Sequence, residues 1–90
     1  MKKIIVTVLG PDRVGIIARV CTLLAERNVN ILDISQTILQ GYFHMAMVAD
    51  AAACTVSLDT LFDELEALGK ELGTRIQGQS EEIFQMMHRI

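Results

Sequence analysis

The sequence predicts an α+β fold, a ferredoxin-like βαββαβ sandwich followed by a short C-terminal helix. Two observations support this prediction. Segments with strand-like and helix-like spacing follow one another in this order along the 90 residues, and two of the strands are separated by only a tight turn. Because the crossover connections are expected to be right-handed, both long helices should lie on one face of the sheet. We therefore expect an antiparallel sheet with the strand order 4-1-3-2.

The first strand and the first helix are predicted within the first third of the chain. Residues 4–9 alternate between two faces and place three aliphatic side chains on one of them: Ile4, Val6 and Val8. Residues 13–27 carry apolar side chains at helical spacing: Ile17, Val20, Cys21 and Leu24. Asn28 can take the left-handed conformation that ends a helix, and Val29 can then fold back on it.

A β-hairpin is predicted next. Residues 31–39 and 42–49 read as strands, and Gln40 with Gly41 forms the reversal between them. The later strand alternates between an apolar face and a mixed face: Phe43, Met45 and Met47 against His44, Ala46 and Val48. Because the turn is so short, the two strands must be antiparallel.

The last third predicts a helix over residues 58–72, a short strand over residues 74–79 and a terminal helix over residues 80–90. Ser57 is a suitable cap for the long helix, and Gly73 closes it. One face of that helix is apolar: Leu58, Leu61, Phe62, Leu65, Leu68 and Leu72. Ser80 caps the terminal helix, whose apolar stripe is Ile83, Phe84, Met87 and Ile90. We interpret residues 1–90 as a single domain with its core in residues 3–79.

Composition excludes several classes of function. The formal net charge is −3 and the eight Lys and Arg residues are scattered, whereas a nucleic-acid surface needs a basic patch. No apolar run approaches the about 18 residues of a membrane span. Cys21 and Cys54 lie far apart among apolar neighbours and read as buried thiols, so neither a metal nor a cofactor is expected. The N-terminus has no cleavable hydrophobic region, which predicts a cytoplasmic protein.

The predicted second strand, residues 31–39, lies at an edge of the sheet. It contains no proline, and Asp33 is its one charged residue, so it is a template for pairing with another strand. We expect the same edge of a second copy to occupy it, which gives a two-fold homodimer with a continuous eight-stranded sheet. The alternative is that a loop covers the edge or that Asp33 alone protects it.

The crossing from the first strand to the first helix, residues 10–16, reads GPDRVGI. We expect Asp12 to cap the helix, and Arg13, Val14 and Gly15 to form its first turn. The amides of a first turn have no partner within the helix, and together with the helix dipole they favour an anion. The alternative is that Asp12 is only a cap, Arg13 a solvated charge and Gly15 a glycine that packs against the sheet.

The segment GPDRVGIIARVCTLLAERNVNILDISQTIL resembles the opening of ACT domains, whose signature is a strand, then G-x-D-R-x-G-I, a helix and a turn that ends in N-I. The resemblance continues through GYFHMAMVAD and covers residues 3–79. The whole chain is similar to the small stand-alone ACT proteins of bacteria, which carry a short helix after the fourth strand.

The resemblance implies a non-enzymatic regulatory module that binds a small molecule, an amino acid above all, at a dimer interface. A regulatory output would go through another protein, so a larger regulated protein is a possible partner, whereas the composition argues against nucleic acid and a membrane. Carried over by position, one wall of the ligand site is Gly10, Pro11, Asp12, Arg13, Val14 and Gly15. The other wall, across the interface, is Asn28, Asn30 and Ile31. Some members that bind amino acids have an amide side chain in place of Asp12, so the identity of the ligand stays open.

Two alternative functions are an interaction module without a ligand and an acylphosphatase. An interaction module without a ligand would need the same free edge. An acylphosphatase shares the fold and holds phosphate with an arginine in the same loop, which reads G-R-V-Q-G-V in that family. Here the loop is only loosely similar, Asp12 would repel the acyl phosphate, and residues 31–50 contain no asparagine to orient a water molecule.

Overall fold

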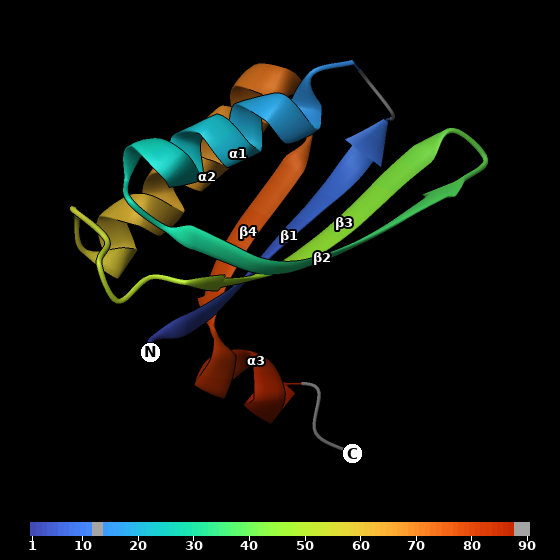
Figure 1. The fold of residues 1–90 in the computed structure, drawn as a ribbon. Coiled ribbons are helices and arrows are strands. Elements are labelled where there is room, and N and C mark those ends of the chain that lie inside the picture. Colours follow the sequence, from blue (N-terminus) through green and yellow to red (C-terminus); the bar gives the residue numbers. More distant parts are fainter. Residues whose placement is uncertain (12–13, 88–90) are drawn as a thin grey trace.

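The computed structural model describes residues 1–11 and 14–87. The elements are β1 (Lys3–Pro11), α1 (Ile16–Glu26), β2 (Asn30–Leu39), β3 (Tyr42–Asp50), α2 (Leu58–Leu72), β4 (Arg75–Ser80) and α3 (Glu81–Met87). The strands form one antiparallel sheet in the order β2-β3-β1-β4, which confirms the predicted topology. Figure 1 shows α1 and α2 together on one side of this sheet, with α3 lying away from them beyond the end of β4.

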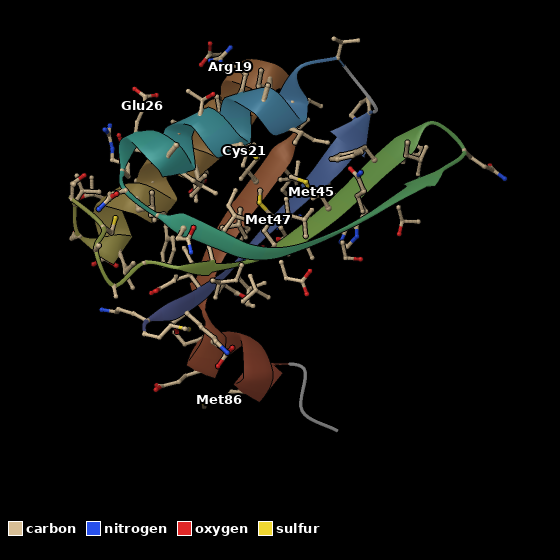
Figure 2. All side chains as sticks on the ribbon, viewed as in Figure 1. Arg19, Cys21, Glu26, Met45, Met47 and Met86 are labelled. Atoms are coloured by element: carbon tan, nitrogen blue, oxygen red, sulfur yellow. The ribbon has the colours of Figure 1, made fainter. Side chains whose placement is uncertain are left out.

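The hydrophobic core fills the space between the sheet and the two long helices. The apolar faces predicted for β1 and β3 are confirmed as buried, and Ile5 on the other face of β1 is buried as well. Figure 2 shows Met45 and Met47 between the sheet and the helices, and neither is accessible to solvent. The largest fully buried side chains come from every layer: Ile4, Leu24, Met45, Met47, Leu61, Leu65, Val6, Val8 and Val20.

The local signals for turns and helix ends are confirmed. Gln40 and Gly41 have φ values of 49° and 82°, the pair of positive angles that a two-residue hairpin of type I′ needs. Asn28 has φ 60°. The backbone amide of Asn28 donates to the carbonyl of Ala25 at 3.0 Å, and the backbone amide of Val29 donates to the carbonyl of Leu24 at 2.9 Å. These two hydrogen bonds form the Schellman motif that ends the helix.

The caps predicted for α2 and α3 are also confirmed. Ser57 Oγ accepts a hydrogen bond from the amide of Thr60 at 3.2 Å, and Gly73 closes α2 with φ 70°. Ser80 Oγ accepts from the amide of Ile83 at 3.3 Å at the start of α3. The predicted continuation of that helix through residues 88–90 lies outside the described residues.

One boundary prediction is wrong. The first helix begins at Ile16 rather than at residue 13, and its cap position is Gly15 rather than Asp12. Gly15 has φ 90°, and a residue in this left-handed conformation interrupts a right-handed helix, so α1 does not extend back through Gly15. Val14 therefore precedes the helix. Asp12 and Arg13 themselves lie outside the described residues.

The two edges of the sheet are β2 and β4. Strand β2 carries a bulge between Ile31 and Asp33, where Leu32 is the extra residue opposite β3. Helix α2 packs along β4, whereas α1 touches β2 only slightly. The edge formed by β2 is consequently the less covered of the two. Within the described part of the chain, no helix is long and apolar enough to cross a membrane.

Candidate functional site

The predicted first wall begins where β1 ends. Gly10 lies opposite Phe43 in the sheet and Pro11 lies opposite Tyr42. A Cβ atom added at Gly10 would come within 2.9 Å of Thr74 Cγ2, so glycine is needed there for the close packing of the residue that precedes β4. This contact fixes the exit of β1 against the rest of the fold.

Gly15 is needed for a different reason. A Cβ atom added there would meet no atom within 4 Å, and the residue has φ 90°. The alternative that Gly15 packs against the sheet is therefore wrong. Glycine is favoured at this position by its backbone conformation, which other residues adopt at a cost. The space around Gly15 is open, and the side chain of the neighbouring Val14 is exposed to solvent.

The first amides of α1 have no hydrogen-bond partner within the helix itself. The first intrahelical bond runs from the amide of Arg19 to the carbonyl of Gly15 at 3.0 Å, so the amides of Ile16, Ile17 and Ala18 precede the regular ladder. Among the described side chains none caps this end, and the first turn carries no acidic residue. The positive end of the helix dipole is thus available to an anion, with a favourable energy of about 0.3–1 kcal/mol at a surface.

The predicted second wall lies at the opposite end of α1. Asn28 is exposed, and its Nδ2 donates to the carbonyl oxygen of Ala53 at 3.3 Å. Asn30 is exposed at the first position of β2, and Ile31 is half-buried against the core. Since α1 contains 11 residues, its two ends are about 16 Å apart. One copy of the chain therefore does not bring the two walls together.

The register of the sheet relates the first wall to the free edge. Gly10 pairs with Phe43, and Phe43 pairs with Ile38, so these residues form one row across β1, β3 and β2. At the other end of the sheet Asn30 pairs with Asp50. The loop before α1 thus lies near the C-terminal end of β2, and Asn30 lies at its N-terminal end.

An apolar border runs beside this edge. We use this name for Ile34 and Ile38 of β2, which are 43% and 61% exposed. Ile34 and Ile38 pair with the buried Met47 and Phe43, so they lie on the face of the sheet that carries the helices. This border was not predicted from the sequence. The alternation of Ile34, Gln36 and Ile38 along the strand was the signal available for it.

The carboxylates with altered acidity lie near the second wall. The amides of Lys2 and Ala52 both donate to Asp50 Oδ1, at 3.1 and 3.0 Å, and these bonds lower the pKa of Asp50, with the bond from Ala52 the larger cause. Arg27 binds Glu64 through two hydrogen bonds and lowers the pKa of that carboxyl. The bonds to Asp50 hold the end of β3, which pairs with Asn30, and the pair of Arg27 with Glu64 ties the end of α1 to α2. Among the described residues, His, Cys, Asp and Glu form no group that could hold a metal.

Comparison with known proteins relates the chain to ACT domains in both sequence and structure. The sequence model of the ACT domain family matches residues 2–79. A UPF0237 protein from Bifidobacterium longum is 56% identical over 90 residues and both chains are covered completely. The solved structure of an ACT domain protein from Streptococcus pneumoniae is similar, with a TM-score of 0.81 and 42% identity over 93% of this chain and 94% of that one. The regulatory subunit of aspartate kinase from Thermus thermophilus shares the fold, with a TM-score of 0.66 and 24% identity over 87% of this chain and 50% of that one.

Proposed function

The chain belongs to the ACT domain family, and from this premise we propose that it acts as a homodimeric sensor of a small molecule, an amino acid above all. ACT domains are regulatory ligand-binding modules. The observation that carries the proposal is the row of the sheet that contains both Gly10, where the loop to the start of α1 begins, and Ile38, near the C-terminal end of the free strand β2. No catalytic step is part of the proposal.

The proposed dimer joins the β2 edges of two copies. Strand β2 has a neighbour on one side only, and an unprotected edge of this kind pairs readily with another strand. The apolar border of Ile34 and Ile38 lies on the strand that forms that edge. Each of these side chains is about half exposed, so its burial in a dimer would contribute about 1 kcal/mol. The edge supplies directional hydrogen bonds, and the border supplies the hydrophobic part of the interaction.

Two-fold symmetry makes the pairing antiparallel, and this accounts for the separation of the two walls. In an antiparallel pair of β2 strands, Asn30 of the partner subunit comes close to the end of β2 that carries Ile38. That end lies in the same row as Gly10, next to the loop that precedes α1. The dimer would therefore contain two equivalent sites, each with the loop of one copy and Asn30 of the other.

The chemistry of these groups suits a zwitterion. The amides of Ile16, Ile17 and Ala18 can hold a carboxylate at the positive end of the helix dipole. The amide side chain of Asn30 can both donate and accept a hydrogen bond. We expect Asp12, which lies outside the described residues, to bind the ammonium group. A free amino acid carries both groups, a carboxylate for the amides of the first turn and an ammonium for Asp12.

Isothermal titration calorimetry against a panel of amino acids tests the proposal. We expect saturable binding of at least one amino acid, and its loss in Gly15→Ala and in Asn30→Ala. Gly73→Ala is a matched control, because Gly73 also has a positive φ, 70°, but closes α2 outside the proposed site. A dimer that binds no amino acid at millimolar concentration would reject the sensor and leave an interaction module.

A further inference from the structure

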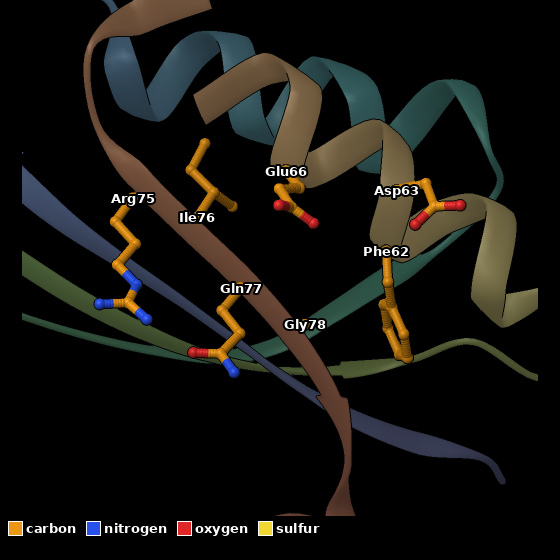
Figure 3. Close-up of a pocket in the computed structure, with 7 residues that line it drawn as sticks. All are labelled: Phe62, Asp63, Glu66, Arg75, Ile76, Gln77 and Gly78. Atoms are coloured by element: carbon orange, nitrogen blue, oxygen red, sulfur yellow. The ribbon is translucent and has the colours of Figure 1, made fainter. Parts of the chain in front are cut away.

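The second edge of the sheet has a character different from that of the β2 edge. Strand β4 is paired with β1 on one side, and α2 packs along it from above. A groove of about 320 Å³ runs between α2 and this edge (Figure 3). Its walls come from two elements: Phe62, Asp63 and Glu66 of α2, and Arg75, Gln77 and Gly78 of β4.

The base of the groove is apolar and fixed. A Cβ atom at Gly78 would come within 2.4 Å of Phe62 Cδ1, so the ring of Phe62 lies directly against the backbone of the strand. Ile76, on the same face of β4, is buried in the core. The Phe62 ring and the backbone of β4 therefore lie in contact at the base of the groove.

The rims of the groove carry opposite charges. Asp63 and Glu66 are exposed on the helix side, and Figure 3 shows both carboxylates on the α2 side of β4. Arg75 is exposed on the other side of the strand. Within residues 1–11 and 14–87 neither Asp63 nor Arg75 takes part in an ion pair, and Glu66 has only a long contact of 3.9 Å with Lys70. Contacts of that kind between exposed side chains are weak.

We propose that the β4 edge binds an extended segment of another protein, which adds to the sheet as a fifth strand. Main-chain hydrogen bonds to the edge would supply affinity, and alternate side chains would supply specificity. Side chains of the added strand that point toward α2 meet Phe62, Asp63 and Glu66, so lysine or arginine is favoured there. Side chains that point the other way meet Arg75, so an acidic or neutral residue is favoured.

Charge decides against a second copy of this chain as the occupant. If two β4 edges paired around a two-fold axis, the α2 helices would lie side by side, since each of them covers its own β4. Asp59, Asp63 and Glu66 of each helix would then lie on the surface turned toward the other helix, and these like charges repel. The β2 edge has an apolar border and suits self-association, whereas the β4 edge has an acidic rim and suits a basic partner. This inference goes beyond the proposed sensor and does not depend on it.

Fluorescence anisotropy with short labelled peptides tests the proposal. The probe is a peptide in which lysine and threonine alternate, and the comparison peptides replace lysine with glutamate or carry N-methyl groups on alternate backbone amides. We expect the lysine peptide to bind at least about tenfold more tightly than either comparison peptide, which corresponds to the loss of about one favourable contact. The N-methyl groups keep the charge but prevent strand pairing, so they separate strand addition from simple charge attraction.

Charge-reversal variants test whether the peptide binds at the β4 edge. Asp63→Lys combined with Glu66→Lys, both at exposed positions of α2, should reverse the preference to the glutamate peptide. Asp33→Lys is the matched control, because it reverses one charge at the β2 edge and should leave peptide binding unchanged even if it weakens the proposed dimer. Absence of saturable binding, equal binding of the N-methylated peptide, or an unchanged preference in the double variant would overturn the proposal.

Discussion

Gly10 of β1 and Ile38 of β2 both pair with Phe43 of β3, one on each side of it. This row places the beginning of the strand-to-helix loop beside the end of the free edge, where Ile38 is 61% exposed. A second copy that pairs with β2 beside Ile38 would therefore lie at the same end of the sheet as the loop that leads to α1. The proposed dimer and the proposed ligand site are consequently two aspects of one interface.

The apolar border should be required for dimer formation. Ile34→Asp or Ile38→Asp replaces an exposed isoleucine beside the edge with a charge, and in the dimer the two charges would be buried without partners. We expect a monomer in sedimentation equilibrium at protein concentrations where the unmodified chain is a dimer. Met86→Asp is the control, since Met86 is 73% exposed on α3 and should leave the dimer intact. A dimer that survives both isoleucine substitutions would place the interface elsewhere.

Gly15→Ala should lower stability through the backbone alone. An L-residue with φ 90° is strained, which costs about 1–2 kcal/mol, and the surrounding space is open, so no steric clash adds to this. Gly15→Asn should cost less, because asparagine tolerates the left-handed conformation better. Urea unfolding of both variants at matched protein concentration measures the difference. Equal stabilities for the alanine and asparagine variants would contradict the assigned conformation.

Gly78 and Phe62 should be energetically coupled. Gly78→Ala introduces a Cβ atom at 2.4 Å from the Phe62 ring, so the ring must move. We expect a loss of about 1–3 kcal/mol in unfolding free energy, as for other overpacked sites. In a Phe62→Leu background the same substitution should cost less, which a double-mutant cycle measures. Strict additivity of the two changes would argue against the contact between the ring and the strand.

The ion pair between Arg27 and Glu64 should make stability depend on pH. Arg27 Nε donates to Glu64 Oε1 at 2.8 Å, and this hydrogen bond is the main reason why the pKa of Glu64 is lowered. A carboxyl with a lowered pKa in the folded state contributes its stabilisation at pH values above its ordinary pKa of 4.5, and loses it as the pH falls through the lowered value. The protein should therefore be more stable than Glu64→Gln at neutral pH, with a difference that disappears in acid.

The control for this prediction is Glu71→Gln. Glu71 pairs with Arg19 at 2.9 Å, but their side chains are 62% and 50% exposed, so removal of this pair should change stability little. Urea unfolding of both variants and the unmodified chain across the acid range gives the comparison. A difference between the protein and Glu64→Gln that stays constant with pH would show that ionisation of Glu64 is not involved.

The features that the sequence predicted correctly depend on few neighbours. The hairpin at Gln40 and Gly41 and the cap at Ser57 are set by residues adjacent in the chain. The β-α-β-β-α-β order follows from periodicity, and the strand order follows from the handedness of the crossovers.

Other features depend on distant parts of the chain. The start of α1 was predicted three residues too early, because Asp12 is a good cap by composition and the conformation of Gly15 is set by the whole loop. Local sequence patterns do not predict contacts between separate elements, such as those of Gly10 with Thr74 and of Gly78 with Phe62. The proposed ligand site could not be predicted from the pattern of one chain for a further reason. Its two walls lie at opposite ends of α1 and would meet only across two copies of the chain.

Mixing two inactive variants tests the central claim most directly. Gly15→Ala impairs the first wall of every site in its own dimer, and Asn30→Ala impairs the second wall. If each site takes one wall from each copy, a mixed dimer contains one intact site and one doubly altered site. After unfolding and refolding together in equal amounts, the mixture should bind the preferred amino acid at about a quarter of the sites of the unmodified protein, with the unmodified affinity. A mixture as inactive as its two components would contradict an interface shared between copies.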